Sequence, residues 1–476
     1  MTIMNVVMMN AKISVFLVLF LMHMPLHARF YTLDQIVDEA VKNSPELQLA
    51  KKEIEHTEIT IQKVLSSFYP RIGFSLQAMH LFEQDIPYLL VDQSVSNLTS
   101  ANSSSGGKSF VSSNIRTASV FDNQNSIDLF PVLPADQMVS SIVIEEMLFN
   151  QGTGLFEVKI GRAMQHVTVC RYEELKKKII AQTKKKYFRL LLEQFRYECS
   201  KEAVVYHTEK HRLMISGYKM GYYSDDDTLA SELELDQSLL NNSEVENEKL
   251  QAAETLIAQS GVAESPSRLW LDDQMPEPVF FISLEEAIAQ LHEQNSALRQ
   301  LKGMENVHRY KLNTMKMHFL PKVGIGASYS HNFPFDFGGT SEDALSGNFS
   351  SVYAHLTWRL FAGLGTKRDI DLARNELEIF QLQEIHTSDS LELAVRVRYR
   401  DLTVLLEKLN FQKKKVNFAQ HLLDKAQDNL RSGLVAQNNV TKQVYNLKNE
   451  KLGYIELLYR FHCSLIDFRF LIGSPP

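Results

Sequence analysis

Two histidines, His207 and His211, lie four residues apart in a segment with helical spacing, so both imidazoles would share one helix face. Such a pair could supply part of a zinc site, but zinc needs a third protein ligand and usually a shielded pocket. Lys210 lies beside the pair, and the surrounding helix is expected to face solvent. We therefore predict that no metal binds here.

Other residue combinations that carry chemistry are missing from the sequence. It contains no nucleophile with a base partner, no phosphate-binding glycine loop and no spaced cysteine ligands. Cys170 and Cys199 fall in one predicted helix, too far apart to form a disulfide, and Cys463 is a third, unpaired cysteine. The net charge of −7 provides no basic surface for nucleic acid. We therefore expect that the protein is not an enzyme, and that it has no catalytic residue, no cofactor and no disulfide.

Residues 1–28 differ from the rest of the chain. Lys12 precedes an almost wholly apolar run, and Ala28 ends a plausible cleavage site. The run is too short to span a bilayer as a stable helix, which is typical of a signal peptide. After Ala28 no stretch approaches eighteen consecutive apolar residues. The protein is therefore predicted to be exported, and any insertion into a membrane would use strands.

An internal repeat organises the mature chain, with a first copy at residues 29–266 and a second at residues 267–476. Three landmarks recur after 251 residues: Leu47 and Leu298, Pro70 and Pro321, Gly73 and Gly324. Three later landmarks recur after 212 residues: Phe149 and Phe361, Gly221 and Gly433, Gly261 and Gly473. The single change of offset corresponds to a longer loop in the first copy, rich in Ser, Asn and Gly at residues 97–113. A shared order with one loop insertion indicates duplication.

Each copy is predicted to contain a helix, two strands and two further helices. The first helices cover residues 33–67 and 284–318, and strands with alternating apolar residues follow each of them. Return strands are expected near residues 142–148 and 354–360, with Leu148, Trp358 and Leu360 on their apolar faces. Glu146 interrupts the first return strand, so it should lie near a membrane interface or the strand should be shifted.

Two very long helices follow, at residues 155–219 and 366–430, and both segments lack proline. A continuous helix of this length extends roughly 100 Å. Each ends at a glycine, Gly221 or Gly433, after which the chain turns back into another helix. We therefore predict two long hairpins that pack as coiled coils.

Four strands per chain cannot close a barrel, and open edges in hydrocarbon leave unpaired backbone groups that cost several kcal/mol each. Membrane-spanning barrels begin at about eight strands. If these strands enter a membrane, several chains must share one barrel.

Several motifs of the first half have counterparts in the same order in the second half. In the first half they are Thr32–Ile36 with Asn43–Leu47, Phe68-Tyr69-Pro70, Leu148–Gly152 and the hairpin glycine. Together they resemble the repeats of the TolC-like outer membrane factor (outer membrane efflux protein) family. The resemblance implies a mixed, mainly α fold: a trimeric, 12-stranded outer-membrane β-barrel continued by a periplasmic coiled-coil tunnel. It also implies passive export, as the exit duct of a tripartite efflux or type I secretion system with an adaptor protein and an inner-membrane pump.

The resemblance assigns two sets of residues. The hairpin tips, Gly221, Tyr222, Gly433 and Leu434, would contact the adaptor protein. A tunnel constriction would involve Asp227, Asn439 and Lys442, although the acidic ring typical of the family is replaced here by Asn438–Lys442. For Asp225, Asp226 and Asp227, capping of a helix start is the favoured interpretation.

Two alternatives remain open at this point. A periplasmic adaptor protein would also carry a signal peptide and a long helical hairpin, but it should have one hairpin flanked by many short strands. A helical scaffold that never enters a membrane would not need alternating segments at matched positions in both halves.

Overall fold

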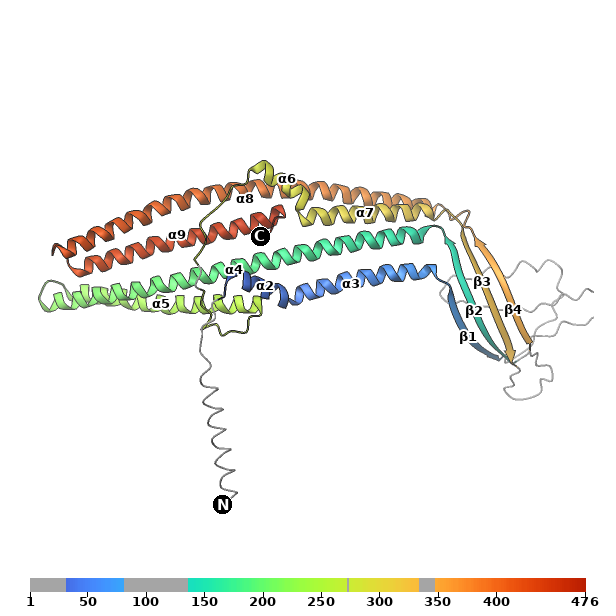
Figure 1. Ribbon diagram of the computed structural model, residues 1–476, viewed down its shortest axis with the longest axis horizontal. Helices are drawn as coiled ribbons and strands as arrows, with labels where there is room; N and C mark the ends of the chain where they lie inside the picture. The colour runs from blue at the N-terminus through green and yellow to red at the C-terminus, as the bar shows by residue number, and fades with distance from the viewer. Residues whose placement is uncertain (1–30, 81–135, 272–273, 334–346) are drawn as a thin grey trace, which may run out of the picture. The chain divides into compact units, whose positions relative to one another are not determined.

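The computed structural model describes residues 31–80, 136–271, 274–333 and 347–476 (Figure 1). These residues form two compact units, one helical and one built around a four-stranded sheet. The predicted signal peptide at residues 1–28 and the predicted loop at residues 97–113 lie outside the described residues. Among the described helices, none is both long and apolar enough to cross a membrane.

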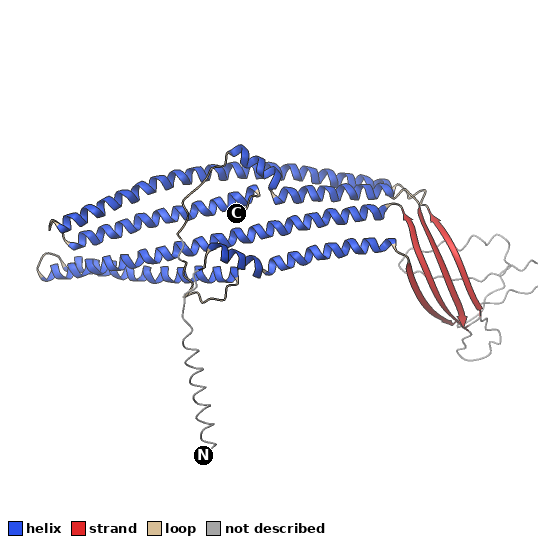
Figure 2. Cartoon of the chain, viewed as in Figure 1, coloured by secondary structure: helices blue, strands red, loops and turns tan. Residues whose placement is uncertain are grey.

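Apart from η1, both halves of the chain contain the same order of helices and strands. Figure 2 shows the helices in blue and the strands in red. The first half contains α2 (Leu33–Asn43), α3 (Pro45–Leu65), η1 (Ser66–Phe68), β1 (Arg71–His80), β2 (Asp136–Asn150), α4 (Thr153–Lys219) and α5 (Asp225–Ser260). The second half contains α6 (Leu284–Gln294), α7 (Ser296–Met317), β3 (Lys322–Phe333), β4 (Gly347–Thr357), α8 (Gly365–Arg431) and α9 (Gln437–Ile472). Helices α4 and α8 each contain 67 residues, and α5 and α9 each contain 36. The prediction of two long helical hairpins is confirmed.

The prediction of one continuous helix at the start of each half is wrong, because each of these segments forms two helices. Ser44 separates α2 from α3 with an extended ψ of 117°, and Asn295 separates α6 from α7 with a ψ of 124°. Pro45 disfavours helical backbone at Ser44. Both break residues then cap the next helix, since Leu47 donates to Ser44 Oγ at 3.4 Å and Leu298 donates to Asn295 Oδ1 at 3.0 Å.

Helices α8 and α9 pack through an apolar seam near their connecting turn. The α8 residues are spaced by three and four: Val416, Ala419, Leu423, Ala426 and Leu430. They contact Val440, Val444 and Leu447 of α9. This spacing is that of a coiled coil, in which side chains of one helix pack between those of the other.

The seam between α4 and α5 has the same spacing but contains several polar side chains. The inward positions of α5 are Thr228, Ser231, Leu235, Ser238 and Asn242. Ser200 Oγ of α4 donates to Asn242 Oδ1 at 2.8 Å, and His211 Nδ1 lies 2.8 Å from Ser231 Oγ. Hydrogen bonds therefore replace apolar contacts in this seam.

The two hairpins are joined along α4 and α9. The joining pairs are Lys185 with Asp467, Arg196 with Glu456, Glu202 with Lys448, and the stacked rings of Tyr206 and Tyr445, which lie 5.1 Å apart. Residue numbers rise along α4 as they fall along α9, so the two helices run antiparallel side by side.

A buried charge cluster lies within this junction. The Glu193 side chain of α4 is 0% exposed and lies 2.7 Å from Arg189 and 3.4 Å from Arg196. Arg196 also reaches Glu456 of α9 at 2.7 Å and Glu248 of α5 at 3.5 Å. Burial raises the pKa of Glu193. The cluster connects three helices from both hairpins.

The second unit contains an antiparallel sheet with the strand order β1-β2-β3-β4. Neighbouring strands pair in sequence, with Ile72 opposite Ile144, Ile144 opposite Ala327 and Ala327 opposite Val352. Strands β1 and β4 each have one partner within this sheet. Both outer edges therefore carry backbone groups that the described sheet does not pair.

Candidate functional site: hairpin tips and sheet faces

The first hairpin turns at Gly221. This residue has a φ of 79°, in the left-handed region that glycine adopts without steric cost. The amide of Gly221 donates to Tyr218 O at 2.9 Å, and that of Tyr222 donates to Gly217 O at 2.8 Å. These two bonds form the Schellman pattern that ends many helices.

The second hairpin turns in the same way at Gly433, which has a φ of 72°. Gly433 donates to Leu430 O at 2.9 Å, and Leu434 donates to Asn429 O at 2.8 Å. A Cβ built on either tip glycine would meet nothing within 4 Å. The predicted positions Tyr222 and Leu434 are 78% and 75% exposed, so both turns present a large side chain to the surroundings.

The two tips differ in how the returning helix begins. Ser224 caps α5 and forms a capping box with Asp227, whose carboxylate accepts from the Ser224 amide at 2.9 Å. These hydrogen bonds lower the pKa of Asp227. Ala436 occupies the corresponding position before α9 and supplies no side-chain cap. The capping interpretation of the aspartates is confirmed for Asp227.

The three predicted constriction residues occupy the first turns of the returning helices. Asp227 is held by its own cap, whereas the Asn439 and Lys442 side chains are exposed on α9. Because they belong to different hairpins, Asp227 does not share a helix with Asn439 and Lys442. Their assignment to a constriction stays a prediction.

The histidine pair lies in the α4–α5 seam. His211 contacts Ser231, and His207 Nδ1 lies 3.5 Å from Glu234 Oε2, where Lys210 also forms an ion pair. The Lys210 hydrogen bond lowers the pKa of Glu234. Within the part of the chain that the structure describes, no group of three or more His, Cys, Asp or Glu side chains could hold a metal.

One contact at the first tip was not predicted from the sequence. Gly217 is buried, and a Cβ built on it would lie 2.3 Å from Cδ2 of Tyr223. The tyrosine ring therefore packs directly on the backbone of the last turn of α4. Gly217 was the available signal, because a glycine inside a helix, four residues before the glycine at which the hairpin turns, suggests close packing.

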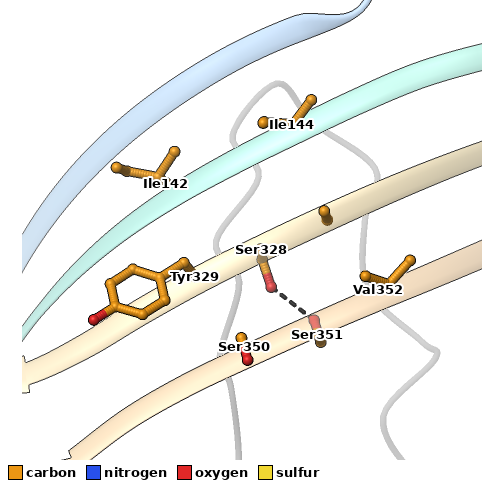
Figure 3. A pocket seen from close by; sticks show the side chains of 8 residues that line it. Ile142, Ile144, Ser328, Tyr329, Ser350, Ser351 and Val352 are labelled. Carbon is orange, nitrogen blue, oxygen red and sulfur yellow. Dashed lines mark hydrogen bonds between the residues drawn. The ribbon is translucent and has the colours of Figure 1, made fainter.

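One face of the sheet carries mainly apolar side chains, and the opposite face carries mainly polar ones. One face carries the cross-strand row Ile72, Ile144, Ala327 and Val352, and Val352 is 87% exposed. A hollow of about 250 Å³ is lined by Ile144, Val352 and neighbouring side chains of β2, β3 and β4, which Figure 3 shows. The opposite face carries serine pairs, with Ser75 and Ser141 at 2.7 Å and Ser328 and Ser351 at 2.8 Å.

The strand carrying Glu146 is shifted, which was one of the two predicted outcomes. The β2–β3 register changes between Glu146 and Phe149, so β2 contains one extra residue at this point. Phe149 then lies opposite Val323, which puts Phe149 on the apolar face where Leu148 was predicted. Glu146 is partly buried, whereas Ile142 and Ile144 earlier in the same strand are exposed.

Two further predicted strand positions were wrong. Strand β4 ends at Thr357, so Trp358 and Leu360 lie beyond it. The indole Nε1 of Trp358 donates to Phe319 O at 2.9 Å. The polar atom of this side chain is therefore bonded to the turn before β3 and not within the sheet.

Three solved outer-membrane proteins resemble this chain in fold. The Campylobacter jejuni CmeC outer membrane channel has a TM-score of 0.67 and 14% identity, covering 93% of this chain and 85% of that chain. The outer membrane protein VceC from Vibrio cholerae has a TM-score of 0.64 and 13% identity, covering 93% and 96%. The open state of the Neisseria gonorrhoeae MtrE outer membrane channel has a TM-score of 0.64 and 10% identity, covering 93% and 89%.

No protein-family model matches the sequence, and no curated protein sequence matches it. The structural similarity nevertheless extends over nearly the whole chain and includes both hairpins and the sheet. The chain therefore has the fold of the TolC-type outer-membrane channels, as the duplicated sequence motifs predicted.

Proposed function

We propose that this protein is the outer-membrane exit channel of an efflux or type I secretion system. It would act as a homotrimer whose three sheets close one 12-stranded barrel and whose helices form a periplasmic tunnel. The channel itself would conduct passively, while an inner-membrane pump, coupled to it through an adaptor protein, would drive transport. The separation of an apolar face from a polar face on an open four-stranded sheet is the observation that carries this proposal.

The sheet supports membrane insertion through its faces and its edges. Ile72 and Phe74 are 74% and 70% exposed on the apolar face, whereas the serine pairs lie on the other face. Lipid would cover the apolar face, and water would fill the polar side. The outer edges of β1 and β4 must be paired in hydrocarbon, which a neighbouring copy would achieve.

The helices support an assembly of several copies. A row of exposed apolar residues follows α8 at intervals of seven: Val397, Val404, Phe411 and Phe418. Their exposed fractions lie between 47% and 64%, although the α8 seam against α9 is already filled by other residues. A heptad row of this kind matches a further coiled-coil contact, which a second copy of the chain would supply.

The structure favours the channel over the predicted alternatives. An adaptor protein should have one hairpin flanked by many short strands, whereas the described residues form two hairpins and one four-stranded sheet. A helical scaffold has no use for a sheet with one exposed apolar face, because such a face would cause aggregation in water. The matched lengths of the helices in both halves further support the duplication at residues 29–266 and 267–476.

The first experiment is extraction of membranes followed by measurement of oligomeric mass in detergent and of conductance in planar bilayers. A channel should resist high salt, require detergent, have the mass of a trimer and conduct ions. A monomer that dissolves without detergent would refute the proposal.

The tips are proposed to contact the adaptor, and Gly433 tests this assignment. Gly433→Trp should abolish efflux while the trimer assembles normally, because the new side chain extends into open space. Gly433→Ala is the matched control, since it imposes the same left-handed strain with little bulk. Normal efflux by the tryptophan variant at wild-type protein levels would exclude the tip as a contact.

A further inference from the structure

Two glycines of β3 interrupt the polar face of the sheet. Gly326 lies directly between Glu145 of β2 and Tyr353 of β4, and Gly324 lies opposite His355 of β4. All these positions are on the face that carries the serine pairs, because they alternate with the apolar positions of the same strands. The glycines therefore leave a strip of β3 without side chains.

The Tyr353 ring occupies this strip. A Cβ built on Gly326 would lie 2.4 Å from Tyr353 Cζ and 2.6 Å from its hydroxyl oxygen. The Tyr353 hydroxyl donates to Glu145 Oε1 at 3.5 Å. The side chain thus starts on β4, crosses β3 and ends at β2, which requires it to lie along the sheet and not to project away from it.

His355 lies in the same way over the second glycine. A Cβ built on Gly324 would meet His355 Cε1 at 2.5 Å and Nε2 at 2.7 Å. The Tyr353 and His355 ring planes are tilted by only 34°, with centroids 6.3 Å apart. Two bulky side chains from one strand are therefore folded down onto the backbone of its neighbour.

We propose that Gly324 and Gly326 set the width of the channel at this level by allowing His355 and Tyr353 to lie flat along its wall. This inference rests on the proposed channel function, in which the polar face lines the pore. A side chain at either glycine would occupy the space of the ring above it. Because the added Cβ lies between the ring and the β3 backbone, the ring would be displaced away from the sheet and into the pore. The two glycines would thus keep the pore wide at the level of Tyr353 and His355.

The test measures single-channel conductance of reconstituted trimers that carry Gly326→Val, Tyr353→Ala or both substitutions. Conductance should fall about twofold in Gly326→Val, because three displaced rings narrow one pore. It should return to the wild-type value in the double variant, which has no ring to displace. Gly73→Val is the matched control: Gly73 lies on the same face in β1, and a Cβ there meets nothing within 4 Å.

The outcomes separate this inference from the proposed function. An unchanged conductance in Gly326→Val, with trimers of normal mass, would overturn the inference and leave the channel intact. A similar fall in Gly73→Val, or no recovery in the double variant, would also overturn it, because the effect would then be a general response of the sheet to valine. Wild-type trimers that do not conduct would refute the channel function itself.

Discussion

The two helical hairpins have equal lengths and the same turn geometry, but different side chains hold them together. Near its tip the second hairpin is closed by Leu423, Val440 and Leu447. The first hairpin has Ser231 in the corresponding stretch and Asn242 farther from the tip, each with a hydrogen bond to α4. The same backbone architecture therefore carries an apolar seam in one half and a polar seam in the other.

This difference has an energetic consequence. Burial of apolar area contributes roughly 25 cal/mol per Å², whereas an intramolecular hydrogen bond contributes only about 0.5–1.5 kcal/mol net. Hydrogen bonds instead select one register, because a shifted seam leaves polar groups unpaired. We expect the tip half of the first hairpin to open more readily than that of the second.

The largest expected effect is in the apolar seam. Leu423→Ala should lower the free energy of local opening of the second hairpin by about 2–4 kcal/mol, because it leaves a cavity. Hydrogen exchange of α8 and α9 measures this change. In the matched variant Ser238→Ala, the lost hydroxyl is bonded only to its own helix, at Leu235 O, so a change within about 0.5 kcal/mol is expected. Equal losses in both variants would contradict the comparison.

A smaller effect should follow from making the polar seam apolar. Asn242→Leu should raise the opening free energy of the first hairpin by about 1 kcal/mol, because apolar burial replaces a weak net hydrogen bond. The hydroxyl of Ser200 keeps an acceptor in Tyr197 O at 2.9 Å. Hydrogen exchange of α4 and α5 tests the gain. The converse change, Leu447→Asn, should weaken the second hairpin, and a stabilising result there would refute the account.

The smallest effect concerns pH at the tips. The pKa of Asp227 is lowered from its ordinary 3.8. The capping box therefore stabilises the tip above pH 3.8, and this stabilisation is lost as the pH falls through the lowered pKa. Residues 220–230 should therefore exchange faster in acid, after correction for intrinsic rates, while residues 432–442 should not. Ala436→Ser should protect the second tip independently of pH. If the amides of both wild-type tips exchanged faster in acid to the same extent, the result would argue against this role of Asp227.

Several features of the fold were predictable because they depend on local chemistry. Gly221 and Gly433 stop long segments without proline, and alternation near residues 72–78 and 323–329 indicated strands. The break at Ser44 was also visible, since Pro45 follows it. The break at Asn295 has no proline after it, and only its position 251 residues after Ser44 indicated it.

The sequence by itself determined the order of elements, the hairpin turns and the alternation of polar and apolar side chains, because each follows from backbone geometry and local spacing. Tertiary structure alone decided which side chains share a seam, where the β2 bulge shifts the register, and that Tyr353 lies across Gly326 to reach Glu145. Those contacts join residues that lie far apart in the chain. They depend on how neighbouring helices and strands align, and no local pattern in either partner records that alignment.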